Sequence, residues 1–168
     1  LCGGLFGDRL WTALTGAASP VRIVPFRGEY WTLSEAAQQW ACRGLIYPVP
    51  DPDLPFLGVH LTRMIDGSVE AGPNAVLAWS RTGYRPTDVN LMDVADALGY
   101  VGLRRLLARY WRFGLGELWR SLHPGAFLKS LQRLVPALRL EDLTPAATAS
   151  LAIGSEIVRR LEEDGPKL

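Results

Sequence analysis

The sequence has few of the residues that hold small secreted or metal-dependent proteins together. Its 168 residues include two cysteines and two histidines. Cys2 and Cys42 are too few for a disulfide scaffold, and a structural zinc site needs more ligands at tight spacing. We therefore expect two free thiols in a reducing compartment and no metal site.

Long apolar runs and a strong charge of one sign are also missing. No run of about 18 apolar residues exists, so no segment is expected to span a bilayer. The first residues lack a basic segment followed by an apolar run, and we expect no signal peptide and a cytoplasmic location. The formal net charge of +1 gives no argument for nucleic-acid binding, and none is expected.

Period-two alternation and turn signals predict a mainly antiparallel sheet in the first half of the chain. The expected strands are residues 21–31, 45–49, 56–63 and 68–79. Asp66-Gly67 predicts the hairpin turn between the last two strands. Gly72-Pro73 predicts a bulge or a sheet edge in the returning strand.

Apolar residues at helical spacing predict helices before, within and after this sheet. The expected helices are residues 5–14, 33–43, 88–98, 103–111, 115–122 and 126–134. Ser34 is a candidate N-cap, Gly16 a stop, and Gly114 and Gly116 are expected to separate helices. A last helix is expected to begin at Thr144-Pro145. Strands followed by helices indicate an α+β fold.

The stretch from Arg22 to Ala75 is dense in Gly, Pro, aromatic and isolated charged residues, which cost backbone entropy or demand partners. His60 lies within it. A histidine can accept a hydroxyl proton near neutral pH, so His60 is a candidate catalytic base. Strand alternation places it on the face opposite Val59 and Leu61. The pattern alone favours a surface or hydrogen-bonded sheet histidine.

Four further side chains in this stretch are candidates for holding a substrate. Arg27 and Arg63 carry guanidinium groups that can bind carboxylates, although alternation puts Arg63 on the face opposite His60, which favours Arg27. Tyr30 and Tyr47 either donate hydrogen bonds to a substrate oxygen or are core rings. The alternative for each arginine is an ion pair with an acid: Glu29, Asp66 or Glu70.

The segments RIVPFRGEYW and GVHLTR resemble substrate-facing strands of L-2-hydroxyglutarate oxidases and dehydrogenases, members of the D-amino-acid-oxidase-like FAD family. The resemblance implies an FAD-dependent enzyme that oxidises L-2-hydroxyglutarate, a small 2-hydroxy acid, to 2-oxoglutarate, with oxygen or a quinone as electron acceptor. It also implies that His60 assists the hydroxyl proton and that Arg27, with Tyr30 or Tyr47, binds carboxylate.

Two short segments resemble parts of the family that lie against the flavin. Cys2-Gly3-Gly4-Leu5 resembles the end of the FAD-binding domain, and Pro145-Ala146-Ala147-Thr148 resembles a helix start beside the flavin. The resemblance therefore implies cofactor contacts at Gly3, Gly4, Pro145, Ala146, Ala147 and Thr148. It divides the chain into the end of an FAD-binding domain (1–20), a substrate domain (21–143) and a flavin-side helix (144–168).

The family's G-x-G-x-x-G unit, which seats the ADP of FAD, occurs nowhere in the sequence. In addition, EDLTP runs directly into AATASLAIG, where the family has a further sheet segment. We expect either a part of a longer protein or a truncated gene. The alternative functions are a non-catalytic remnant without flavin and a related flavin oxidase acting on an amino acid or glycerol phosphate.

Residues 101–140 are rich in basic side chains, and Glu117 is the one acidic residue in that span. Tyr110, Trp111, Phe113 and Trp119 are interleaved with them. One interpretation is a patch that contacts a membrane surface or a quinone, peripheral to the inner membrane. The other, which we favour from the sequence, is a helix with an aromatic core stripe and solvated arginines.

Overall fold

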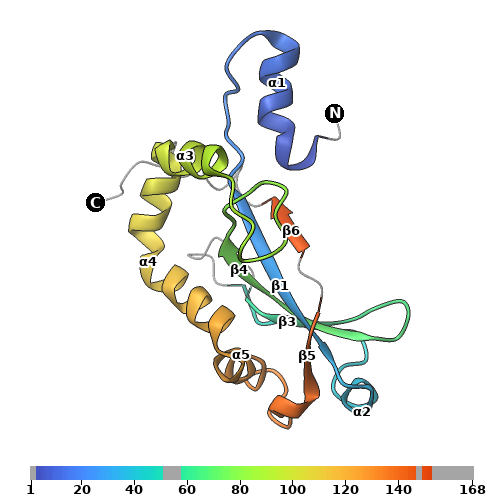
Figure 1. The fold of residues 1–168 in the computed structure, drawn as a ribbon. Helices are drawn as coiled ribbons and strands as arrows, with labels where there is room; N and C mark the ends of the chain where they lie inside the picture. The colour runs from blue at the N-terminus through green and yellow to red at the C-terminus, as the bar shows by residue number, and fades with distance from the viewer. Residues whose placement is uncertain (1–2, 51–57, 147–148, 153–168) are drawn as a thin grey trace. The chain divides into compact units, whose positions relative to one another are not determined.

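The computed structural model describes residues 3–50, 58–146 and 149–152 (Figure 1). The helical elements are η1 (Gly4–Phe6), α1 (Gly7–Thr15), α2 (Glu35–Gln38), α3 (Leu91–Gly99), α4 (Val101–Leu122), α5 (Pro124–Leu131) and η2 (Leu140–Asp142). The strands are β1 (Pro25–Leu33), β2 (Leu45–Ile46), β3 (His60–Arg63), β4 (Val69–Leu77), β5 (Leu143–Pro145) and β6 (Ala149–Ala152). The predicted α+β fold is confirmed.

The chain divides into two compact units that are each discontinuous in sequence. The first unit contains residues 1–27, 77–114 and 150–168, and the second contains residues 28–76 and 115–149. The predicted linear boundaries after residues 20 and 143 stay a prediction. We describe the two units separately.

The strands form one sheet in the order β2-β3-β4-β1-β5, and β6 also pairs with β1. The pairings β2–β3, β3–β4 and β1–β5 are antiparallel, and the antiparallel arrangement predicted for the first half of the chain is confirmed by β2–β3 and β3–β4. Asp66-Gly67 forms the predicted turn between β3 and β4, and Gly67 has φ +88°, a conformation that favours glycine. The hairpin formed by β3 and β4 carries much of the candidate site described below.

Strand β4 changes its alternation at the predicted irregularity. Val69 and Ala71 are buried before it, whereas Asn74 and Val76 are buried after it, so the buried positions shift by one residue. Gly72 has φ +149° at this point. The predicted irregularity is therefore present, but the sheet-edge alternative is wrong because β4 lies between β3 and β1.

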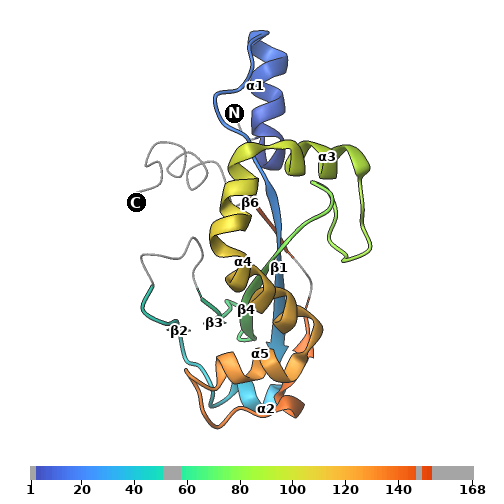
Figure 2. The same cartoon turned by 90° about the vertical axis from the view of Figure 1, so that its left-hand side faces the viewer.

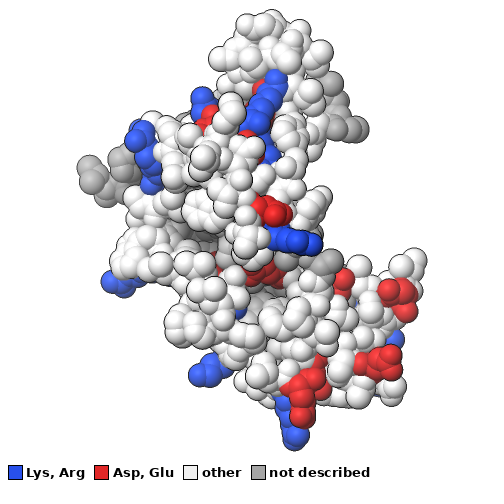
Figure 3. All heavy atoms as spheres, in the orientation of Figure 1, with Lys and Arg blue, Asp and Glu red and all other residues white. Residues whose placement is uncertain are grey.

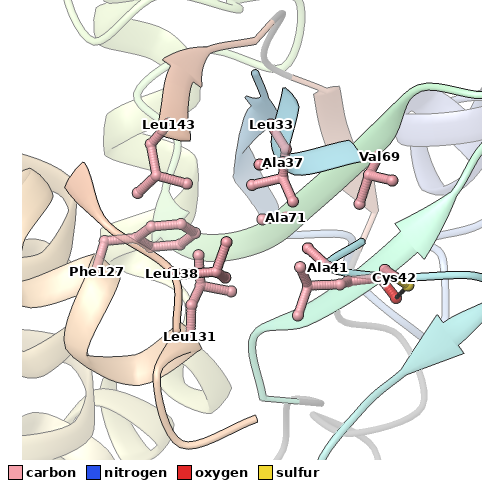
Figure 4. Packing of buried hydrophobic residues seen from close by; sticks show 11 residues of the cluster. Leu33, Ala37, Ala41, Cys42, Val69, Ala71, Phe127, Leu131, Leu138 and Leu143 are labelled. Carbon is pink, nitrogen blue, oxygen red and sulfur yellow. Dashed lines mark hydrogen bonds between the residues drawn. The ribbon is translucent and has the colours of Figure 1, made fainter. Parts of the chain in front are cut away.

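The apolar core of the second unit lies between the sheet and helices α2 and α5 (Figure 4). Phe127 and Leu131 of α5 are fully buried, and Trp31 of β1 stacks on Phe127 with ring centroids 5.9 Å apart. Figures 1 and 2 show α2 and α5 at the same end of the sheet. The other members of the core are Leu33, Ala37, Ala41, Cys42, Leu61, Val69, Ala71, Leu138 and Leu143.

Buried charges hold the first unit together. The Arg81 guanidinium is 3% exposed and donates to both carboxylate oxygens of Asp8, at 2.6 and 2.9 Å. The buried Asp93 accepts from the Arg81 backbone N–H at 2.9 Å and from Arg9 at 2.6 Å. Charge-assisted hydrogen bonds of this length are strong, so these contacts join α1 to α3 and to the segment after β4.

Helices α2 and α4 differ in length from the predicted helices. Ser34 caps α2 as predicted, accepting from the Ala37 N–H, but the α-helix ends at Gln38, well before Gly44. Gly114 and Gly116 do not separate helices, because α4 continues through both. Its one non-helical residue is Tyr110, where the helix kinks. Tertiary context therefore overrides the weak helix propensity of glycine in α4.

The aromatic stripe of α4 is not buried as predicted. Trp111 is 54% exposed and Trp119 is 58% exposed. Leu115, Leu118 and Leu122 are also exposed, which extends an apolar face along the second half of the helix. Figure 3 shows Lys and Arg side chains separated by uncharged atoms along the edge where Figure 1 draws α4. The sequence interpretation of a core stripe is wrong for both tryptophans.

The helix predicted to begin at Thr144-Pro145 is also wrong for the described residues. Leu143–Pro145 is strand β5, with Trp31 opposite Pro145, and Ala149–Ala152 is strand β6. The backbone N–H of Ala146 donates to the Tyr30 carbonyl at 3.0 Å. Pairing with β1 satisfies these backbone groups and outweighs the local helix signal. Residues 153–168 lie outside the described residues.

Candidate functional site

His60 and Gly72 face each other across the hairpin of the second unit. In the β3–β4 pairing, His60 lies opposite Gly72 and Thr62 lies opposite Glu70. Leu61, between His60 and Thr62, is fully buried in the core. Because neighbouring side chains of a strand point to opposite faces, His60 and Thr62 point to the face that α5 does not cover.

A backbone hydrogen bond fixes the tautomer of the neutral His60 ring. The Nδ1 atom lies 3.2 Å from the Gly58 carbonyl oxygen. A carbonyl only accepts, so Nδ1 carries the hydrogen and donates it. In the neutral ring Nε2 is then unprotonated and accepts a proton. The half-buried ring of His60 is thus held in the form that a general base requires.

The Tyr30 ring and the Glu29 carbonyl lie directly against the Gly72 backbone, so that no side chain fits at this position. A Cβ atom at this position would lie 2.8 Å from the Glu29 carbonyl oxygen and 2.9 Å from the Tyr30 ring atom Cδ1. Trp31, the neighbour of Tyr30, packs against the core, so Tyr30 points to the face that carries His60. These three residues form a row across β3, β4 and β1, which we call the His60–Tyr30 row.

The Tyr30 hydroxyl remains a hydrogen-bond donor at neutral pH. Burial raises its pKa above the ordinary value, and the negative charge of Glu70 raises it further. Glu70 alternates with the buried Val69 and Ala71 and therefore lies on the same face as Tyr30. The sequence indicates Glu70 as a possible ion-pair partner, and the same alternation that places His60 could also place Glu70 on this face.

Tyr47 extends the row toward the edge of the sheet. The β2–β3 pairing sets Leu45 opposite Thr62 and Ile46 opposite Leu61. Tyr47 is the first residue after β2, and continuing this register by one residue would set it opposite His60. Ile46 packs against the core, so alternation directs Tyr47 to the face of His60. Its side chain is 56% exposed, which leaves the hydroxyl accessible.

Neither predicted arginine is assigned to this row by the described contacts. Arg63 donates through Nη1 to the backbone carbonyls of Gln38 at 2.9 Å and Cys42 at 3.4 Å, which ties it to the segment that begins with α2. Arg27 is 5% exposed and belongs to the first unit. The structure thus brings Tyr30, Tyr47 and His60 onto one face and does not add Arg63 to them.

The predicted flavin contacts fall in both units and partly outside the described residues. Gly4 has φ +47° and nothing within 4 Å of the position a Cβ would take, so its backbone is open to close approach by a ligand. A Cβ at Gly3 would instead lie 2.8 Å from Leu10. Pro145 and Ala146 are held against β1. Ala147 and Thr148 lie outside the described residues.

Two kinds of site are missing from the part of the chain that the structure describes. It holds no group of three or more His, Cys, Asp or Glu side chains that could bind a metal ion. It also has no helix long and apolar enough to cross a membrane. Cys42 is a free, buried thiol that donates to the Gly44 carbonyl at 3.1 Å, and Cys2 lies outside the described residues.

Curated proteins that are similar to this chain share one name. The L-2-hydroxyglutarate dehydrogenase of Escherichia coli strain K12 is 50% identical over 144 residues, 86% of this chain and 34% of the relative. The one from Indibacter alkaliphilus is 44% identical over 142 residues, 84% of this chain and 35% of the relative. The mitochondrial one from Nematostella vectensis is 50% identical over 142 residues, 84% of this chain and 31% of the relative.

The chain therefore spans about a third of the length of these curated relatives. A family model described as FAD dependent oxidoreductase matches residues 1–145. This match includes the His60–Tyr30 row and both glycines of the predicted flavin contact at the N-terminus. The chain belongs to the family of FAD dependent oxidoreductases, whose cofactor is FAD.

Proposed function

We propose that this chain supplies the substrate-binding face of an enzyme that oxidises L-2-hydroxyglutarate to 2-oxoglutarate. The observation that carries the proposal is the name shared by relatives 44–50% identical to it, L-2-hydroxyglutarate dehydrogenase. The His60–Tyr30 row supports it, because it offers a proton acceptor and hydroxyl donors on one face of the sheet.

Oxidation of a 2-hydroxy acid requires the loss of two hydrogens from one carbon. In the proposed reaction, Nε2 of His60 takes the hydroxyl proton as the O–H bond breaks and the C2=O bond forms. FAD, when bound, supplies the two-electron acceptor for the hydride that leaves C2. The Gly58 carbonyl keeps the proton on Nδ1, so the ring is ready to receive a second proton at Nε2.

The row also offers donors for substrate oxygens. The Tyr30 hydroxyl stays protonated because burial and Glu70 raise its pKa, so it donates to a carboxylate or to the developing carbonyl. Tyr47 offers a second, more exposed hydroxyl on the same face. Carboxylate binding by Arg27 and Arg63 stays a prediction, as do the electron acceptor, oxygen or quinone, and the cytoplasmic location.

A chimeric enzyme tests the proposal without assuming what flanks this sequence. The 144 aligned residues of this chain would replace their counterpart in the Escherichia coli relative. We expect L-2-hydroxyglutarate to reduce the flavin of the chimera. Reduction by an amino acid or glycerol phosphate instead would change the substrate assignment, and a chimera that binds FAD but reacts with none of them would favour a non-catalytic remnant.

His60→Ala tests the base in the same chimera. Loss of general-base catalysis is expected to lower kcat by about 10²–10⁴-fold. His123 is the matched control, since it is the other histidine of the chain and lies between α4 and α5. His123→Ala should leave kcat near the parent value. Equal activity of the parent chimera and the His60→Ala variant would remove His60 from the reaction.

The exposed face of α4 supports the predicted contact with a membrane surface. Leu115, Leu118, Trp119 and Leu122 are 48–66% exposed at helical spacing in the second unit, and Lys129 is exposed on α5. Apolar side chains beside basic ones favour an anionic lipid surface. Co-sedimentation with anionic vesicles should fall for Trp119→Ser combined with Leu122→Ser, and unchanged sedimentation would exclude this face.

A further inference from the structure

A buried polar cluster lies on the helix-covered side of the sheet, next to the strand segment that carries Gly72. At its centre Asn74 is 1% exposed. Its Nδ2 donates to the Glu117 carbonyl at 2.8 Å and to the Glu29 carboxylate at 3.4 Å. Its Oδ1 accepts from Arg120 Nε at 3.3 Å. One side chain of β4 is thus bonded to both β1 and α4 within the second unit.

Glu117 completes the cluster from α4. Its carboxylate accepts the backbone N–H of Ala75 at 3.0 Å, and Arg120 pairs with its other oxygen. Glu117 is 6% exposed, so water does not satisfy these groups. The Ala75 N–H is a backbone donor of the strand itself, which means that the helix side chain holds the strand directly.

These bonds hold only in the shifted alternation of β4. Val69 and Ala71 face the core, so unbroken alternation would turn Pro73 inward and Asn74 outward. If the alternation of β4 were not shifted, the Asn74 amide would lose its hydrogen-bond partners, and Glu117 would lose the Ala75 N–H. Buried polar groups without partners are costly, and a fully satisfied network specifies one arrangement. The cluster is fully bonded as the strand stands.

We infer that Asn74 and Glu117 are positioning residues that lock the shifted alternation of β4 and thereby hold the Gly72 backbone against the Tyr30 ring, beside His60. In the locked strand the Tyr30 ring packs directly on the Gly72 backbone, because a Cβ there would lie 2.9 Å from Cδ1 of the ring. The inference concerns the proposed site but does not depend on the identity of the substrate.

Three variants of the 168-residue chain separate this role from plain stabilisation. Glu117→Leu removes the acceptor for Ala75, whereas Glu117→Gln keeps an acceptor oxygen there. Gln132→Leu is the matched control, since the Gln132 side chain also donates to a backbone carbonyl of the second unit, that of Leu138, at 2.8 Å. The readouts are thermal unfolding, hydrogen exchange over residues 69–77, and the NMR titration of the Tyr30 ring, assigned with Tyr30→Phe.

We expect Glu117→Leu to speed exchange over residues 69–77 and to move the Tyr30 titration toward the ordinary range for tyrosine, because the Gly72 backbone no longer packs on the ring. Glu117→Gln should restore both readouts. Gln132→Leu should lower the unfolding midpoint and change neither. A Glu117→Leu chain that unfolds earlier with both readouts unchanged would overturn the inference.

The chimeric enzyme gives a second measurement if Glu117→Leu does not fold. Asn74→Ser keeps a small polar side chain but is too short for its three partners. We expect it to lower kcat/KM on the order of tenfold to a hundredfold, because the row is misaligned, while Gln132→Leu stays near the parent. An unchanged kcat/KM for Asn74→Ser would contradict the lock. An inactive parent chimera would count against the proposed function and leave the Tyr30 readout decisive.

Discussion

Arg81 of the first unit and Phe127 of the second are both buried, but by different means. Arg81 is 3% exposed and is neutralised by Asp8 through two charge-assisted hydrogen bonds, with Asp96 3.4 Å away. Phe127 is fully buried among aliphatic side chains and stacks on Trp31. Arg81 is held by directional bonds between charges, and Phe127 is held by apolar contact.

This difference predicts how each unit fails. An apolar core loses stability in proportion to the volume removed, because the neighbours relax only in part. Removing one partner of a buried ion pair lowers the free energy of unfolding strongly, because the remaining charge is then unpaired in the protein interior. Deleting a core ring, removing one charge of an ion pair and changing the pH separate these two behaviours, with effects expected to decrease in that order.

The largest loss is expected for Phe127→Ala. Deleting a fully buried aromatic ring should lower the free energy of unfolding by about 3–5 kcal/mol. Urea unfolding followed by circular dichroism measures the change. Phe127→Leu, which keeps most of the volume, should cost clearly less. Equal losses for the two variants would show that the ring stacked on Trp31, rather than the volume, stabilises the second unit.

A somewhat smaller loss, about 3 kcal/mol, is expected for Arg81→Met. The substitution leaves the buried Asp8 carboxylate without its guanidinium. Arg81→Met combined with Asp8→Leu should recover part of the loss, because the unpaired charge is gone. Urea unfolding of the single and double variants tests this. A double variant less stable than Arg81→Met would show that Asp8 stabilises the unit through its bond to the Ile23 N–H, 3.0 Å long, rather than through the pair.

The smallest effect expected is a pH dependence of opposite sign in the two units. Burial alone would raise the pKa of Asp8, but the hydrogen bonds from Arg81, Ile23 and Arg9 outweigh it and hold the pKa below its ordinary value. The pKa of Asp93 is lowered in the same way. Burial is the main influence on Glu117 and raises its pKa, although Arg120 opposes it.

The signs follow from linkage between protonation and folding. Asp8 and Asp93 contribute stability above their unfolded pKa values, and this is lost as the pH falls through their lowered folded values. Glu117 destabilises the folded state when ionised, and this penalty disappears as the pH falls through its raised value. As the pH falls from neutral toward the ordinary pKa of a glutamate, the wild-type chain should therefore gain stability that Glu117→Gln does not. Equal pH profiles for the two chains would contradict the assignment.

Local signals predicted much of the fold and part of the site. Alternation around Leu61 placed His60 on the uncovered face, Asp66-Gly67 marked the hairpin turn, and Ser34 capped its helix. These features depend on neighbouring residues in the sequence. Gly72-Pro73 predicted the irregularity of β4, because the positive φ that glycine allows and the N–H that proline lacks are properties of these two residues alone.

The features that sequence analysis missed depend on partners far along the chain. Asn74 and Glu117 are 43 residues apart and show no pattern until the helix and strand meet. The strands β5 and β6 form because β1 offers free backbone groups, which the Ala-rich sequence does not show. The exposure of Trp119 could not be predicted either, since an amphipathic stripe predicts a partner surface without saying which surface covers it.

Cys42 gives the second unit a reporter that needs no engineering at its own position. Its thiol is 2% exposed and packed among Ala41, Leu61 and the rest of the apolar core. An alkylating reagent can modify it only when that core opens. With Cys2 changed to Ser, the labelling rate at low reagent concentration would give the equilibrium constant for opening of the second unit. At high reagent concentration it would give the rate at which the core beneath the His60–Tyr30 row opens.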